Sequence, residues 1–69
     1  MTSRPTPSST AADQLFQQNQ FAQADEAYAA LLQAEPTHEW AALQHARCAV
    51  QMGEGRLARD RFAALLKAH

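Results

Sequence analysis

The chain has 69 residues, a net charge of −1 and a single cysteine, Cys48. A chain this short buries only about 60% of its unfolded surface, so we expect one small domain of marginal stability. One cysteine forms no internal disulfide, and the near-neutral charge gives no general attraction to nucleic acid phosphates. The sequence has no run of about 18 apolar residues and no apolar N-terminal signal segment, so we expect no membrane span and a cytoplasmic location.

Residues 1–9 contain two of the three prolines and three serines. This composition does not support a packed element and predicts a disordered N-terminal tail. The following stretch, TAAD, resembles a capping box in which the Thr10 hydroxyl accepts from the backbone N–H of Asp13. The first helix is expected to run from there to about Asn19.

A second helix is expected from about residue 21, because Ala24, Tyr28 and Leu31 recur at the three-to-four-residue spacing of one helical face. Pro36 ends this helix, since proline disfavours helical geometry at the preceding residue, Glu35.

A third helix follows, with Thr37 as its expected cap. Its larger side chains fall on one side and its alanines on another, which predicts burial on two sides: Trp40, Leu43, Arg47 and Val50 on the first, and Ala42, Ala46 and Ala49 on the second.

Gly53 supplies the positive φ that ends the third helix, and a last helix is expected from about Arg56. Its apolar stripe consists of Phe62, Leu65 and Leu66. The high alanine content, the few β-branched residues and the lack of alternation predict an all-α chain.

Two stretches of the chain nearly repeat each other at a distance of 34 residues, AYAALLQAEP from Ala27 and RFAALLKAH from Arg61. When residues 12–35 are compared with 46–69, eight of the 24 pairs are identical. The identical pairs are Ala12/Ala46, Gln17/Gln51, Ala24/Ala58, Ala29/Ala63, Ala30/Ala64, Leu31/Leu65, Leu32/Leu66 and Ala34/Ala68.

A 34-residue helix–turn–helix unit with small, aromatic and proline positions in this order resembles the tetratricopeptide repeat. The resemblance covers residues 9–69 and implies four antiparallel helices in a right-handed solenoid, with repeat one at 10–36 and repeat two at 37–69. Small residues then lie where the paired helices cross. Trp40 lies about two positions earlier than the family's tryptophan, and His45 replaces an expected leucine. An unrelated four-helix bundle is the alternative.

The resemblance implies a non-catalytic interaction module, a small adaptor or accessory subunit that binds a protein or peptide through a concave groove and the uncapped last helix. The groove positions would be Asp13, Phe16, Gln17, Trp40, Leu43, Arg47, Val50 and Gln51. Trp40 and Arg47 are candidate anchors, because aromatic and arginine side chains supply much of the binding energy at interfaces. The other interpretation of Trp40 is a packed core aromatic.

Repeat arrays generally need about three units, whereas this chain has two. The last helix should therefore leave apolar surface uncovered, and its candidate association residues are Arg59, Phe62, Leu65 and Leu66. The chain would pair with itself, dock on a larger protein or be a piece of a longer array. A self-assembling subunit, such as a homodimer, is the alternative function. Opposite charges favour such contacts, because residues 12–35 carry −4 and residues 46–69 carry +3. The other interpretation of these charges is that they only solvate exposed helix faces.

Other chemistry has weak support in the sequence. His45 and Cys48 share a helical face, as a metal site or a thiolate–imidazole pair would, but a third ligand is lacking, so we expect no enzyme, metal or cofactor. Some family members bind the C-terminal carboxylate of a partner with basic and amide side chains. This chain has Ser9, Asp13 and Gln44 at the corresponding positions, so the resemblance does not imply that activity. Nucleic-acid binding is not expected, since it would rest on three arginines of the last helix: Arg56, Arg59 and Arg61.

Overall fold

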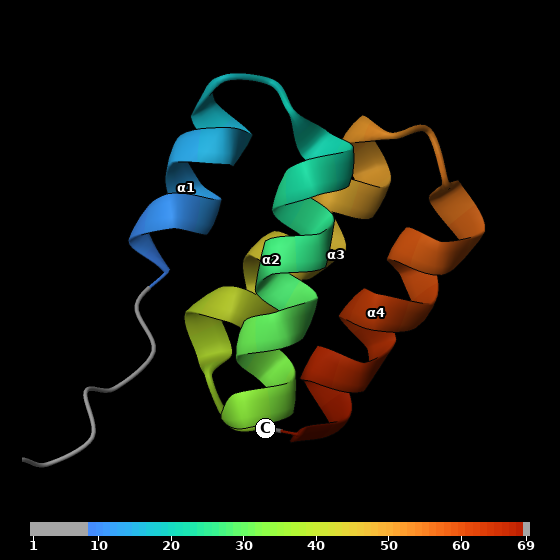
Figure 1. Ribbon diagram of the computed structural model, residues 1–69. Helices are drawn as coiled ribbons and strands as arrows, with labels where there is room; N and C mark the ends of the chain where they lie inside the picture. The colour runs from blue at the N-terminus through green and yellow to red at the C-terminus, as the bar shows by residue number, and fades with distance from the viewer. Residues whose placement is uncertain (1–8, 69) are drawn as a thin grey trace, which may run out of the picture.

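The computed structural model describes residues 9–68, which form four α-helices joined by short turns (Figure 1). The helices are α1 (Thr10–Gln17), α2 (Phe21–Ala34), α3 (Glu39–Gln51) and α4 (Gly55–Ala68). No strand occurs within this described range, so the prediction of an all-α chain is confirmed. The predicted tail, residues 1–9, lies outside the described residues except for Ser9, and so does His69.

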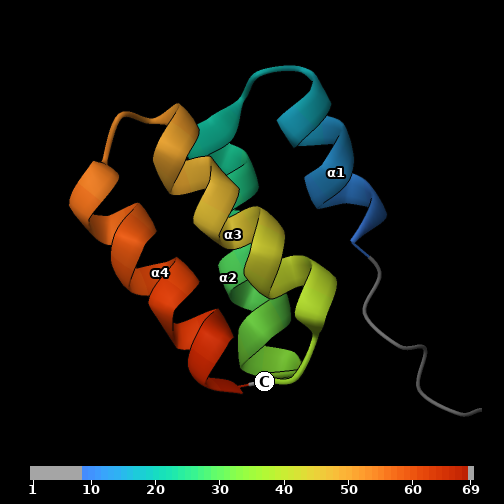
Figure 2. The same ribbon diagram turned by 180° about the vertical axis from the view of Figure 1, so that it is seen from behind.

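Two helical hairpins, α1–α2 and α3–α4, stack on each other. α2 lies in front of α3 in Figure 1 and behind it in Figure 2, while α1 and α4 flank this central pair on opposite sides. Each helix packs against the next one along the chain. A pair of stacked hairpins is the arrangement that the 34-residue repeat predicts.

The same kind of turn closes both hairpins. Asn19 and Gly53, 34 residues apart, are the two residues with positive φ in the described chain, at 63° and 76°. Each donates its N–H to the carbonyl three residues back, and the next residue donates to the carbonyl five residues back. These are Schellman motifs. The predicted Gly53 turn is confirmed, and α1 ends at Gln17, earlier than predicted, because the left-handed Asn19 cannot continue a right-handed helix.

The start of α1 differs from the prediction by one residue. Ser9, not Thr10, is the N-cap, and its carbonyl accepts from the N–H of Asp13 at 2.7 Å. The Ser9 hydroxyl also donates to the Asp13 carboxylate at 2.9 Å. The predicted Thr10 cap is therefore wrong, because the hydroxyl that bonds to the Asp13 carboxylate belongs to Ser9, one helical turn before Asp13.

The start of α3 also differs from the prediction. The N–H of His38 donates to the carbonyl of Glu35 at 3.1 Å, which places Thr37 inside the turn. His38 is then the N-cap, and its Nδ1 accepts from the N–H of Ala41 at 3.1 Å. The predicted Thr37 cap is wrong for this reason. α4 begins at Gly55, one residue before the predicted start.

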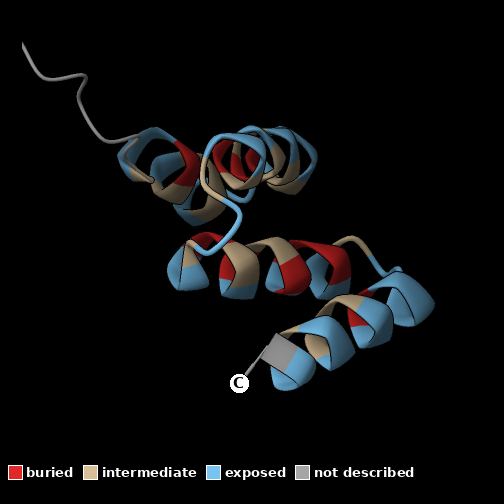
Figure 3. Cartoon of the chain, turned by 90° about the horizontal axis from the view of Figure 1, so that it is seen from below, coloured by how far each residue is buried: buried red, intermediate tan, exposed pale blue. Residues whose placement is uncertain are grey.

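The apolar core lies among α1, α2 and α3. Its buried residues are Ala12, Ala24, Tyr28, Leu31, Ala41 and Cys48. α4 adds one buried residue among those described, Ala58, and is otherwise largely exposed (Figure 3). The small residues that the repeat places at helix crossings are all buried: Ala12, Ala24, Ala46 and Ala58. Small side chains there let the helix axes approach closely.

α3 packs between α2 and α4, and only one of its two predicted buried sides, the alanine side, is buried. Its buried residues are Ala41, Gln44, Ala46, Cys48 and Ala49. Trp40 is 45% exposed and Val50 is 52% exposed, because only the short α1 lies beside that face of α3. A large part of the predicted core side of α3 is therefore open to solvent.

Candidate functional site

Asp13 of α1 joins three helices through its carboxylate. Its Oδ1 accepts from the Tyr28 hydroxyl of α2 and, at 2.9 Å, from Nε1 of Trp40 on α3, while Ser9 donates to Oδ2. Burial acts to raise the pKa of Asp13, but the hydrogen bonds from Tyr28, Trp40 and Ser9 outweigh it, so the pKa lies below its usual value. The ionised carboxylate therefore fixes Trp40 beside α1.

Tyr28 is fully buried, and its pKa lies well above the usual value. Burial is the main cause, followed by the hydrogen bond to Asp13, while a hydrogen bond with Gln44 opposes the shift. The hydroxyl therefore remains protonated and acts as a donor inside the stack.

Arg47 of α3 lies over the ring of Phe16 of α1. Its guanidinium carbon is 5.6 Å from the ring centroid, within the range of a cation–π contact. Nη1 of Arg47 also donates to Oε1 of the buried Gln44 at 3.1 Å. Phe16 meets Phe21 edge to face, with the ring centroids 5.1 Å apart. Two contacts thus connect α1 and α3, Asp13 with Trp40 and Phe16 with Arg47.

The predicted groove positions follow one face of α1 and α3. The structure brings Asp13 to Trp40 and Phe16 to Arg47, and Leu43 lies between these contacts along α3 with 36% of its surface exposed. Gln17 and Gln51 are exposed, each as the last residue of its helix. Trp40 is half exposed, so it is not a fully packed core aromatic.

A polar cluster between the repeats was missed at the sequence level. Oδ1 of Asp25 on α2 lies 2.5 Å from Nη1 of Arg61 on α4 and 3.4 Å from Nε2 of His45 on α3. The same Arg61 nitrogen donates to the carbonyl of His45 at 2.7 Å. Burial, followed by the charge of Arg61, lowers the pKa of His45, and Asp25 opposes this. The opposite charges of the two halves were the available signal, but they did not identify the pair.

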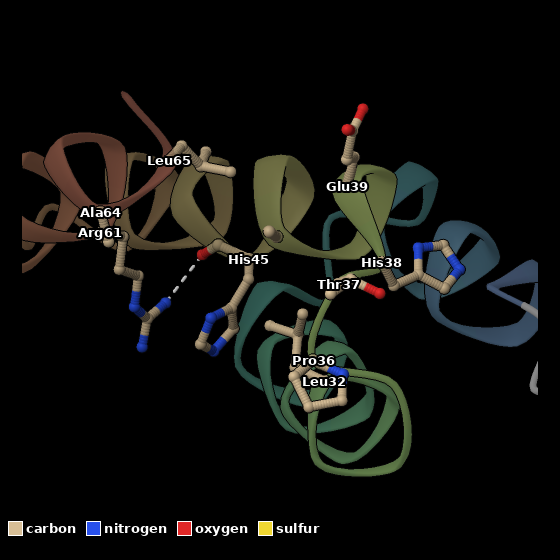
Figure 4. A pocket seen from close by; sticks show the side chains of 10 residues that line it. Leu32, Pro36, Thr37, His38, Glu39, His45, Arg61, Ala64 and Leu65 are labelled. Carbon is tan, nitrogen blue, oxygen red and sulfur yellow. Dashed lines mark hydrogen bonds between the residues drawn. The ribbon is translucent and has the colours of Figure 1, made fainter. Parts of the chain in front are cut away.

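Beside this cluster, α2, α3 and α4 enclose an open cleft of about 550 Å³. Its apolar lining comes from Leu32, Pro36, Ala42, Ala64 and Leu65. Figure 4 shows His45 and Arg61 together at one end, while the His38 ring and the Glu39 carboxylate point away from the hollow. This cleft lies at the α2–α4 side of the stack and shares no residue with the predicted groove.

Cys48 and His45, the pair singled out in the sequence, have different surroundings. Cys48 is fully buried, and burial raises the pKa of its thiol to about 11. The His45 ring nitrogen Nε2 faces Asp25. Within residues 9–68, no three His, Cys, Asp or Glu side chains gather as metal ligands would. Of the three arginines considered for nucleic-acid binding, Arg61 is engaged by Asp25.

The last helix leaves part of its apolar stripe in solvent. Leu66 is 80% exposed, whereas Phe62 and Leu65 are partly buried and Arg59 is exposed. None of the described helices combines the length and hydropathy that crossing a lipid bilayer requires. These exposures show that α4 is packed along one side only.

A family model described as tetratricopeptide repeat matches residues 15–69. Comparisons with curated proteins and with solved structures gave no significant match. The matched range includes α2, α3, α4 and the end of α1, and thus both turns that contain a positive-φ residue.

Proposed function

The chain belongs to the tetratricopeptide repeat family, whose members generally mediate protein–protein interaction, and from this we propose that it is a non-catalytic module that binds a peptide or protein segment along α1 and α3. The observation that carries the proposal is the exposed side of α3. Trp40, Leu43 and Val50 are 45%, 36% and 52% exposed. Their spacing of three and seven residues places them in one line along the helix.

The polar contacts beside this line support binding of an extended or helical segment. Asp13 holds the Trp40 ring in one position, so little side-chain entropy remains to be lost when a partner covers it. Arg47 lies between Leu43 and Val50 and is held by Phe16 and Gln44. An apolar line interrupted by one fixed cation favours a partner with apolar side chains and one acidic group.

Peptides selected from a random-sequence display library on the wild-type chain provide the test. We expect Trp40→Ala and Arg47→Glu each to weaken binding of the selected peptides at least about tenfold, as at interface hot spots. Arg56→Glu is the matched control, because Arg56 is an exposed arginine on α4. Helix content, measured by circular dichroism, should stay constant. Collapse of the helices in Trp40→Ala would assign Trp40 to the core, and unchanged binding by both variants would refute the groove.

A further inference from the structure

The two repeats provide an internal comparison for the exposed side of α4. In the second helix of each repeat, α4 residues are more exposed than the α2 residues 34 positions before them. Tyr28 is 0% exposed and Leu32 is partly buried, whereas their equivalents are the partly buried Phe62 and the 80% exposed Leu66. In repeat one, the α3–α4 hairpin covers these positions. The α4 face formed by Arg59, Phe62 and Leu66, called here the end face, is the same kind of surface without its cover.

The charge at the centre of this surface is reversed between the repeats. In repeat one, Asp25 faces His45 and Arg61 of the following hairpin. Its equivalent in repeat two is Arg59, which is exposed. A hairpin that covered the end face in the same geometry would therefore need an acidic side chain opposite Arg59. Arg56 and Lys67 add positive charge to the exposed surface of α4, against one acidic residue, Asp60.

A second copy of the chain does not meet this requirement. If a copy continued the stack, Ala11 and Ala27 would occupy the places of His45 and Arg61, and neither can pair with Arg59. The surface of α1 that would be covered is also polar. The equivalents of the buried Gln44 and Cys48 are Thr10 and Gln14, which are exposed. Pairing of two α4 helices in antiparallel fashion would place Arg56 near Lys67 of the copy, with like charges together.

We propose that the end face binds a helical segment of another protein that presents small and apolar side chains to Phe62 and Leu66 and an acidic side chain to Arg59. This inference rests on the protein-binding function proposed above but uses a different surface. The partner segment takes the position that α3 and the first half of α4, up to Arg61, take on repeat one. The acidic group supplies the specificity, because Arg59 would otherwise be covered without a partner.

A charge-swap experiment tests this proposal with a labelled synthetic peptide of residues 37–68, made with its own Arg61 or with Arg61→Glu. In the stacked geometry, probe position 61 meets residue 59 of the full-length chain. By fluorescence anisotropy, we expect the wild-type chain to bind the Arg61→Glu probe roughly tenfold more tightly than the unchanged probe, the size of a charge-assisted contact. The Arg59→Glu chain should reverse this preference.

Two further variants separate the end face from the groove and from binding elsewhere. Leu66→Asp should reduce capture of the Arg61→Glu probe at least about tenfold without loss of helix content, because Leu66 is 80% exposed in the free chain. Leu43→Asp, in the groove, should leave capture unchanged. The proposal is overturned if the same probe binds more tightly to both the wild-type chain and the Arg59→Glu chain, or if Leu66→Asp binds the Arg61→Glu probe as the wild type does. It is also overturned if the chain alone sediments as a dimer that Leu66→Asp abolishes.

Discussion

Removal of the Asp13 carboxylate should destabilise the stack by about 2 kcal/mol. Asp13→Ala leaves the Tyr28 hydroxyl, which is 0% exposed, without its acceptor. A buried polar group that loses its partner costs about 1–3 kcal/mol. Trp40 adds little to this cost, because it is 45% exposed and water can accept from its Nε1.

A loss of this size is a large part of the total stability, since 60 ordered residues at roughly 0.05–0.15 kcal/mol each give about 3–9 kcal/mol. Urea unfolding followed by far-ultraviolet circular dichroism measures it. With an m-value near 1 kcal/mol/M, the midpoint should fall by about 2 M. Asp60→Ala is the matched control, an exposed carboxylate on α4 whose removal should change stability by less than about 0.5 kcal/mol.

The double variant isolates the bond itself. Asp13→Ala and Tyr28→Phe remove the same hydrogen bond, so together they should cost about 1 kcal/mol less than the sum of the single changes. If the two effects add, or if Asp13→Ala costs no more than Asp60→Ala, the carboxylate does not join the helices as described.

Two more predictions concern His45 and His38. The pKa of His45 is lowered in the folded chain from 6.5, so the unfolded chain takes up a proton first, and stability present above about pH 6.5 is lost as the pH falls. In urea titrations, His45→Gln should therefore lose less stability than the wild type between about pH 7.5 and 5.5. Equal losses in the two proteins would contradict the lowered pKa. His38→Ala should lower the free energy of unfolding by about 1 kcal/mol, because it removes the α3 cap, whereas Thr37→Ala should change it by less than about 0.5 kcal/mol. Thermal unfolding measures both variants, and a larger loss of stability in Thr37→Ala than in His38→Ala would restore Thr37 as the cap.

Sequence patterns predicted the features that depend on chain-local geometry and on the repeat. Gly53 as a turn residue and the small residues Ala12, Ala46 and Ala58 at the crossings follow from conformational freedom and from periodicity. The caps were displaced by one residue because polar side chains adjoin each other at both helix starts. Tertiary contacts decide between them, as when Asp13 is held by Tyr28 and Trp40.

Helical periodicity could not predict the polar cluster of Asp25, His45 and Arg61, for a physical reason. Asp25 and Arg61 lie 36 residues apart on helices of different repeats, and helical periodicity reports only which residues share a face. His45 was noticed for its spacing from Cys48, whereas its actual neighbour comes from α2.

The sparse burial of α4 makes the cooperativity of the chain uneven. Repeat arrays unfold as a sum of unit stabilities and neighbour interfaces, and α4 is attached through the buried Ala58, the cleft-lining Leu65 and the ion pair of Arg61. Opening of α4 alone therefore requires less free energy than global unfolding. The backbone amide hydrogens of α4 exchange with solvent through this local opening, whereas the amide hydrogens around Tyr28 exchange only on global unfolding.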